Sequence, residues 1–146
     1  RFHPQDGQLY TCGMFAWAGS AIQPGGLYRI RATGQPMHLP VGLHATRSGM
    51  QITFTEPLDE EAARELLNYQ VTTWSLKRTE NYGSDHYGTK HVAVESVQVS
   101  ADRKTITLLM PDIQPTWCME INYSLKLADG APFLGVIHNT VHQLSE

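Results

Sequence analysis

The sequence lacks long apolar runs and any excess of positive charge. No stretch approaches the roughly 18 consecutive apolar residues that a membrane-spanning helix needs, so we expect no membrane span. The formal net charge is −3, and a chain without a basic field has little to attract nucleic acid. Apolar residues make up 41% of the chain and charged residues 17%, which is typical of a folded domain with a core. We therefore expect a globular protein that binds no nucleic acid.

Cysteine is also scarce. The chain has two, Cys12 and Cys118, and no CxxC or CxxCH motif. These absences exclude a zinc ribbon, a thioredoxin-type site and a covalently attached c-type haem within this sequence. The two thiols could form a disulfide in an oxidising compartment or remain free, because two positions alone do not determine pairing.

Catalytic and calcium-binding motifs are missing as well. The sequence has no G-x-S-x-G elbow and no EF-hand spacing. Ser84, Asp85 and His86 are consecutive, and neighbours in sequence rarely converge as nucleophile, orienting acid and base. We therefore predict no catalytic residue. The chain starts at Arg1 rather than Met, so we expect a processed product or an excised fragment.

Alternation of apolar and polar residues is the strongest pattern present. Between residues 41 and 59, two alternating runs flank Ser48-Gly49, which is typical of a β-hairpin. The apolar residues of these runs are Val41, Leu43, Ala45, Met50, Ile52 and Phe54. Their shared face must be covered, so we expect a second sheet packed against the first.

Further alternating runs give about seven strands after Gly34. The expected strands are Val41–Arg47, Met50–Thr55, Tyr69–Leu76, Val92–Val99, Ile106–Met110, Trp117–Leu127 and Val136–Leu144. A change of phase predicts a bulge near Thr72-Thr73, and a second change falls at Glu95-Ser96. Strands and turns at this spacing predict an all-β, immunoglobulin-like β-sandwich.

One segment, Pro57–Asn68, has helical periodicity. It predicts one short helix between strands, with Asp59 as its N-cap and two glutamates at the positive end of the helix dipole. The apolar stripe of this helix consists of Ala62, Ala63, Leu66 and Leu67.

The inward-facing residues of the strands predict the core. They are Leu43, Ile52, Phe54, Val71, Ile106, Leu108, Trp117, Met119, Ile121 and Tyr123. We also expect Trp74 in the core, because many sandwiches bury a tryptophan in the corresponding strand. Burial of Cys118 and Glu120 in place of Met119 and Ile121 would contradict the expected register.

Residues 1–34 differ from the rest of the chain in their sequence pattern. They hold two short expected strands, Gln8–Cys12 and Leu27–Arg31, with Asp-Gly and Gly-Gly breaks around them. Two strands alone are marginally stable in water, so we expect this segment to pack on other parts of the protein. Breaks near Gln35 set the expected domains at 1–34 and 35–146.

Two sets of motifs resemble known families. The segments GMQITFTEPLD, NYQV and SADRKT resemble bacterial immunoglobulin-like domains and lie within Gly49–Pro132. RFHPQDGQLYTCG and GGLYRIRATGQP resemble the last blade of glucose/sorbosone-dehydrogenase-like β-propellers. WSLKRTENYGSDHYG, PTWCMEINYSLKLADG and VIHNTVH resemble the C-terminal domain that follows such propellers in large secreted bacterial proteins.

This second resemblance implies a secreted or periplasmic parent protein that resembles pyrroloquinoline-quinone sugar dehydrogenases. In that family the catalytic base and the cofactor ligands lie in earlier blades, so no catalytic, cofactor-binding or metal-binding residue is carried over to this chain. Pyrroloquinoline quinone or c-type haem would belong to the parent protein, and no cofactor is expected in this chain. Whether the parent is an enzyme is left open.

Three functions follow as hypotheses. The leading one is a non-catalytic accessory domain, docking to or stabilising the parent β-propeller or another protein domain. The second is a carbohydrate-binding module with a saccharide as partner. The third is a metal-binding redox domain. Copper or zinc at stoichiometric amounts would favour the third, and glycan binding would favour the second.

Seven histidines motivate the metal hypothesis. His138 and His142 are four residues apart, which on a strand separates them by about 13 Å, so they cannot chelate one ion together unless the segment is helical. His38 with His44, and His86 with His91, could converge as ligands. Structural or solvent-exposed histidines explain the same pattern, and we predict no tightly bound transition metal.

The expected binding site is the polar segment Lys77–Lys90. It is long for a connection between two strands, and such loops often carry function. Its candidate binding residues are Asn81, Tyr82, Asp85, His86 and Tyr87. Aromatic rings beside hydrogen-bonding groups suit a protein surface or a sugar, although an ordered loop held by its own tyrosines would look the same.

Overall fold

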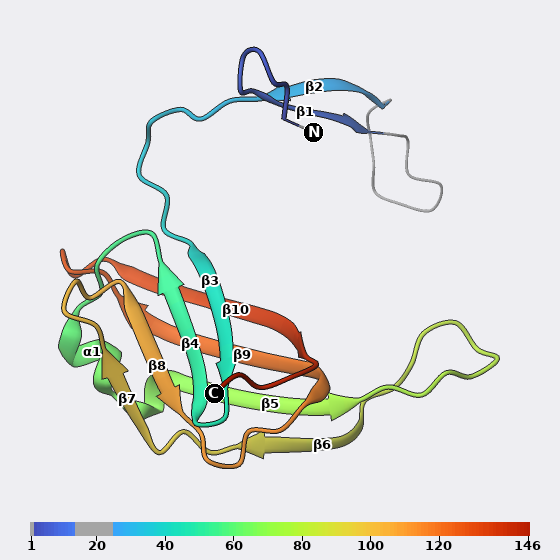
Figure 1. Cartoon of the computed structure of the whole chain (residues 1–146), viewed down its shortest axis with the longest axis vertical. Coiled ribbons are helices and arrows are strands. Elements are labelled where there is room, and N and C mark those ends of the chain that lie inside the picture. The colour runs from blue at the N-terminus through green and yellow to red at the C-terminus, as the bar shows by residue number, and fades with distance from the viewer. Residues whose placement is uncertain (1, 14–24) are drawn as a thin grey trace. The chain divides into compact units, whose positions relative to one another are not determined.

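The chain divides into two compact units, 1–36 and 37–146. The computed structural model describes residues 2–13 and 25–146 (Figure 1). Arg1 and residues 14–24 lie outside this description, as does the part of the expected N-terminal segment that falls on them. Cys12 lies in the first unit and Cys118 in the second.

The first unit contains a two-stranded antiparallel sheet. Strand β1 spans Leu9–Gly13 and strand β2 spans Gly26–Ile30, so both expected strands are present within a residue or two of their predicted ends. Leu9 pairs with Ile30 at one end and Gly13 with Gly26 at the other. None of the described residues of this unit is buried. The hairpin therefore has no core of its own in the described part of the chain.

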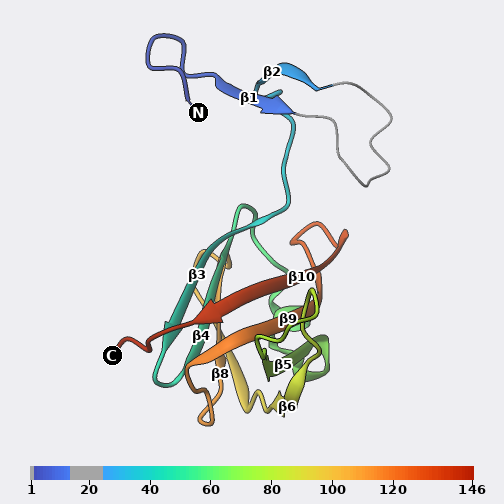
Figure 2. The ribbon, with the colours of Figure 1, turned by 90° about the vertical axis from the view of Figure 1, so that its right-hand side faces the viewer.

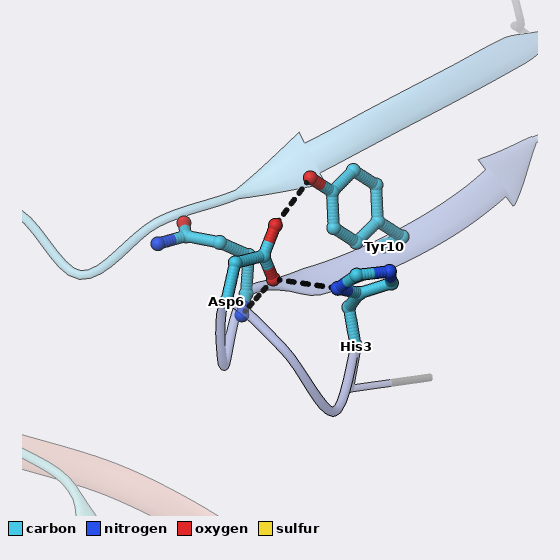
Figure 3. A network of polar contacts seen from close by, with 4 residues as sticks. His3, Asp6 and Tyr10 are labelled. Atoms are coloured by element: carbon cyan, nitrogen blue, oxygen red, sulfur yellow. Dashed lines mark hydrogen bonds and ion pairs between the residues drawn. The ribbon is translucent and has the colours of Figure 1, made fainter.

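A tight turn before β1 is held by Asp6 (Figure 3). One carboxylate oxygen accepts the backbone N–H of Gln8 at 2.9 Å, and the other accepts the Tyr10 hydroxyl at 2.9 Å. The His3 ring lies 3.2 Å from the same carboxylate. These contacts, the Gln8 N–H first, hold the pKa of Asp6 below its usual value. Gly7 takes a φ of +65°, which glycine adopts without strain.

The second unit is a sandwich of two four-stranded antiparallel sheets, in the orders β3-β4-β8-β7 and β10-β9-β5-β6. The strands are β3 Pro40–Thr46, β4 Gly49–Phe54, β5 Tyr69–Ser75, β6 Tyr87–Val92, β7 Ser96–Val99, β8 Thr105–Leu109, β9 Thr116–Lys126 and β10 Pro132–Val141. Figure 2 shows β9 and β10 passing across β3 and β4. These orders match the A-B-E-D and G-F-C-C′ sheets of immunoglobulin-like folds. The predicted all-β sandwich with one short helix is confirmed.

The core lies between the two sheets. The predicted core residues that are buried are Ile52, Phe54, Val71, Ile106, Leu108, Met119, Ile121 and Tyr123. The rings of Phe54, Tyr123 and Phe133 meet edge to face with centroids 5.4–5.6 Å apart, a geometry that aromatic quadrupoles favour. The expected register of β9 is confirmed, because Met119 and Ile121 face inward.

Two predicted core residues are instead exposed. Leu43 lies opposite Ile52 but is 39% exposed, because β3 is an edge strand that is covered from one side only. Trp117 is 66% exposed. The pairing of β9 with β10 shifts between Asn139 and Val141, which leaves an extra β9 residue near Trp117. The resulting bulge turns the indole out of the core.

Trp74 is also outside the core, so that prediction was wrong. The pairing of β5 with β9 is regular from Tyr69 to Trp74, and no bulge interrupts it at Thr72-Thr73. Strict alternation therefore places Trp74 on the outer face, opposite Cys118. The irregularity lies on β6, where the pairs Thr73–Lys90 and Ser75–Tyr87 enclose one extra residue.

The chain changes sheet at the second predicted change of phase. The sequence suggested one strand over Val92–Val99, but β6 ends at Val92 in one sheet and β7 begins at Ser96 in the other. The expected loop Lys77–Lys90 is shorter as well, because β6 already begins at Tyr87.

The predicted helix is present but divided. Helix α1 spans Glu60–Arg64, and a 3₁₀ turn, η1, spans Leu66–Asn68. Asp59 caps α1 as predicted, accepting the N–H of Ala62 at 2.8 Å. Of the expected apolar stripe, Ala63 alone is buried, and Leu67 is 92% exposed.

Tyr69 ties α1 to the sandwich. Its buried hydroxyl donates a hydrogen bond to the carbonyl of Ala63 at 2.6 Å. Burial raises the pKa of the Tyr69 phenol well above its usual value, so the hydroxyl remains protonated and available as a donor.

The Ser100-Ala101-Asp102 turn explains part of the SADRKT motif. The Ser100 hydroxyl donates to Asp102 at 2.5 Å and accepts the N–H of Thr105 at 2.9 Å. Asp102 also accepts the N–H of Lys104 at 3.1 Å, and these contacts, the Ser100 hydroxyl first, lower its pKa. Lys104 reaches back to the carbonyl of Thr55 at 2.8 Å. The motif residues therefore fix a turn and contact no candidate binding residue.

The last residues close the edge of the other sheet. Ser145 forms a parallel bridge with Thr46 of β3. The Ser145 N–H donates to the carbonyl of Ala45 at 3.1 Å, and the Arg47 N–H donates to the carbonyl of Ser145 at 3.0 Å. The chain thus leaves β10 in one sheet and ends against β3 in the other (Figure 1).

Candidate functional site

The predicted binding loop joins β5 and β6. Residues 76–86 project beyond the ends of these two strands, away from the body of the sandwich (Figure 1). Asn81, Tyr82, Asp85 and His86 lie in this projection, and Tyr87 is the first residue of β6. None of the five is buried. The Tyr82 side chain is fully exposed, at 108% of its reference area.

Hydrogen bonds between the Ser84 side chain and the backbone shape the loop. The Ser84 hydroxyl accepts the N–H of Lys77 at 2.9 Å and donates to the carbonyl of Asp85 at 2.9 Å. Gly83 takes a φ of +89°, which allows the chain to reverse. The side chains of Asn81 and Asp85 make no hydrogen bond or ion pair with described residues. They are therefore available to a partner.

Two ring contacts hold the base of the hairpin. The His86 ring stacks on the Trp74 indole with centroids 4.2 Å apart and an angle of 18° between planes. The Lys77 ammonium lies 4.3 Å from the centroid of the Tyr87 ring, within cation–π range. Of the five candidates, His86 and Tyr87 thus have structural partners within the hairpin. Tyr82 has no ring or hydrogen-bond contact with described residues.

The histidines have separate partners. His44 shares a 2.8 Å hydrogen bond with Ser145, and the His91 ring lies 3.3 Å from the Thr72 hydroxyl. The ring of His138 lies 3.8 Å from Glu120. Within residues 2–13 and 25–146, no three His, Cys, Asp or Glu side chains form a group that could hold an ion. No described helix is long and apolar enough to cross a bilayer.

The outer face of the sheet β10-β9-β5-β6 holds surface residues that the sequence analysis missed. Leu134 and Val136 of β10 are 66% and 52% exposed. They face outward because their neighbours Phe133 and Ile137 face the core. A strand with apolar residues at both parities is the signal that could have identified this face.

No protein-family model and no curated protein matches the chain. Among solved structures, the chain is similar to one reported as "Crystal structure of the S-layer protein rSbsC(31-844)". The TM-score is 0.52 and the sequence identity 22%, over 70% of this chain and 13% of that chain. The likeness concerns the fold alone, and this chain corresponds to a small part of that protein.

Proposed function

We propose that the sandwich is a non-catalytic accessory domain of a secreted, sugar-dehydrogenase-like β-propeller protein, where it docks to the propeller or to another protein domain. The single observation that carries this proposal is the first unit. It has two strands, a well-defined turn and no buried residue among those described. Such a hairpin is marginal alone, so it needs further strands to pack against.

A propeller blade supplies what the hairpin needs. Blades are four-stranded antiparallel sheets, so two strands are half of one blade. The turn built by Asp6, Gly7 and Tyr10 coincides with the segment that resembles the last blade of glucose/sorbosone-dehydrogenase-like proteins. Any pyrroloquinoline quinone or c-type haem would bind in the parent protein and not in this chain.

The similar sandwich in an S-layer protein supports a secreted or periplasmic location. The β5-β6 hairpin supports the docking role, since Tyr82 presents a whole aromatic ring beside the free side chains of Asn81 and Asp85. An aromatic ring buries a large area at a low cost in conformational entropy.

The first test of this proposal is the sequence of the gene upstream of the codon for residue 1. The coding sequence before residue 1 should encode the remaining strands of a propeller, and a gene without them refutes the proposal. If the gene encodes a propeller, hydrogen exchange is the second test. The backbone amides of β1 and β2 should exchange rapidly with solvent in the isolated chain. In the joined protein they should be protected, because they then belong to a larger sheet.

Two loop variants test the docking surface. Tyr82→Ala and Tyr87→Ala should each reduce binding of the sandwich, residues 37–146, to the separately expressed propeller. Tyr82→Ala should leave the thermal midpoint unchanged because its side chain is fully exposed. If both variants lower the thermal midpoint, and binding is lost only to the extent that the domain unfolds, the loop is structural.

A carbohydrate-binding module is the second candidate function. The observation in its favour is a pair of exposed aromatic side chains, Tyr82 and Trp117, since flat rings are suited to sugar faces. A glycan panel screened with the wild type and with Tyr82→Ala distinguishes this function from docking. No observation among the described residues favours a metal-binding redox domain.

A further inference from the structure

A continuous groove crosses the outer face of the sheet β10-β9-β5-β6. It consists of two adjoining hollows of about 430 and 460 Å³. Asn68, Ser124 and Leu134 line both hollows, which makes them one surface. The groove runs from Val136 on β10 to the first turn of α1.

Apolar side chains form one half of this groove. Leu67 of η1, Leu134 and Val136 line it and are 92%, 66% and 52% exposed. Apolar side chains that are gathered on one surface indicate an interaction site more strongly than scattered ones do.

Uncompensated carboxylates form the other half. Glu61 and Glu65 line the hollow next to α1 together with Asp59, and Lys126 is the only cation among the lining residues. Asp59 is engaged in capping α1, and Glu65 accepts the N–H of Leu67 at 3.2 Å. The Glu61 carboxylate has no hydrogen bond or ion pair with described residues. The surplus charge at this end is negative.

Amides and a hydroxyl lie along the floor. The register places Gln70, Asn122 and Val136 in one row and Ser124 opposite Leu134. Gln70 and Ser124 make no side-chain hydrogen bond with described residues. The side-chain amide N–H of Asn68 donates to the carbonyl of Ala62. These groups offer both donors and acceptors, which matches the backbone N–H and C=O groups of an extended peptide.

We propose that this groove binds an extended peptide segment of a protein partner that carries apolar side chains next to lysine or arginine. The apolar side chains contact Leu67, Leu134 and Val136, and the basic side chains pair with Glu61 and Glu65. Charge complementarity selects this partner, because a neutral or acidic segment would leave the carboxylates unpaired. The proposal goes beyond docking to a propeller, since it names a different surface and a partner that need not be a propeller.

The test uses three capped hexapeptides on the intact 146-residue chain. One has three leucines followed by three lysines, the second three leucines followed by three glutamates, and the third three serines followed by three lysines, because the apolar and acidic residues lie at opposite ends of the groove. The leucine–lysine peptide should bind at least about tenfold more tightly than either of the others, since each of these lacks one of the two interactions. Backbone amide shifts in nuclear magnetic resonance should map its site to β10 and η1.

Matched variants locate the effect. Leu134→Ser and Glu61→Gln should each weaken binding of the leucine–lysine peptide, and only the loss at Glu61 should shrink in high salt. Val41→Ser on the other sheet, at a position that is 62% exposed, and Glu80→Gln in the β5-β6 loop are the controls, and neither should matter. Equal effects of controls and groove variants, or no binding of this peptide, overturn the proposal. Self-association of the chain that Leu134→Ser abolishes also overturns it, because the occupant would then be a second copy.

The two proposals fail separately. Tyr82→Ala should impair docking to a propeller and leave peptide binding intact, whereas Leu134→Ser should do the reverse. A result in which Tyr82→Ala alone abolishes peptide binding would place the peptide on the loop and overturn the groove assignment.

Discussion

Two strand pairs in this chain are both antiparallel but have different surroundings. In the first unit, β1 pairs with β2, and Leu27 and Ile30 are 78% and 52% exposed. In the second, β3 pairs with β4, and Met50 and Ile52 are 1% and 0% exposed. The difference lies in the second sheet that covers β4. Backbone pairing alone contributes little net stability, because water satisfies the same groups in the unfolded chain.

The contrast predicts that one unit unfolds cooperatively and the other does not. The sandwich buries a contiguous cluster from both sheets, whereas no described side chain of the first unit is buried. Substitutions of the same type should therefore have large effects in one unit and small effects in the other.

The largest difference is expected for phenylalanine. Phe54→Ala should lower the free energy of unfolding by about 3–5 kcal/mol, because Phe54 is 2% exposed and packs against two other rings. Phe2→Ala should change it by less than about 0.5 kcal/mol, since Phe2 is 69% exposed. Urea denaturation of both variants measures this. A comparable shift of both midpoints would mean that the two units unfold together.

Glycine gives the second contrast. At Gly49, φ is +154° and an added Cβ would lie 1.9 Å from the carbonyl oxygen of Leu108. Gly49→Ala should therefore cost about 3 kcal/mol, combining backbone strain with displacement of β8. At Gly7, φ is +65° and an added Cβ meets no atom within 4 Å. Gly7→Ala should leave sandwich unfolding unchanged, and a loss of sandwich stability there would contradict the division into units.

Tyr69→Phe should have a moderate effect. Loss of the bond to Ala63 should cost about 1 kcal/mol at neutral pH. Burial raises the pKa of Tyr69, so the folded state keeps a proton that the unfolded state releases above about pH 10. Wild-type stability should therefore fall as pH rises above that value, and the variant should lose less. Tyr82→Phe, a fully exposed position, should match the wild type throughout.

The smallest effect concerns two acidic turns. Asp6 and Asp102 both have a lowered pKa and both accept a backbone N–H, from Gln8 and Lys104 respectively. A lowered folded-state pKa stabilises the turn above about pH 4, and this contribution disappears as pH falls through the lowered value. As pH falls, the protection of the Gln8 amide against hydrogen exchange should be lost before that of the Lys104 amide.

The Lys104 amide should stay protected to lower pH. Its turn is also fixed by the N–H of Phe54 bonding to the carbonyl of Lys104 and the N–H of Leu58 bonding to the carbonyl of Arg103. Exchange measured from pH 6 to pH 2 on the wild type, with Asp6→Asn and Asp102→Asn as references, provides the comparison. Simultaneous loss of both turns would show that the core does not protect the second.

The sandwich itself followed from alternation in the sequence. Met119 and Ile121 face the core as predicted because one face of β9 is entirely apolar. Trp117 does not face the core, because a bulge turns it outward. The bulge depends on how β9 pairs with β10, and the sequence of one strand does not contain that information. The predicted burial of Leu43 was wrong for a similar reason. Alternation predicts the face on which a residue lies, but it does not predict whether its strand lies at the edge of a sheet.

The candidate site was only partly predictable. Asn81 and Tyr82 lie in a loop as predicted, because polar residues without hydrophobic period favour a loop. His86 and Tyr87 contact Trp74 and Lys77, and those contacts depend on how β6 pairs with β5, which the residues of the loop do not encode. The groove at Leu134 depends on three strands and η1 meeting, which no local pattern encodes.

The parallel bridge between Ser145 and Thr46 has a mechanical consequence. A pull applied to the sandwich through its first strand and its last residues would draw β3 and Ser145 in opposite directions along a shared axis. The two backbone bonds, from Ser145 to Ala45 and from Arg47 to Ser145, would then carry the load side by side, in shear. They must break together and not in turn, so this short contact should resist stretching more strongly than its length suggests.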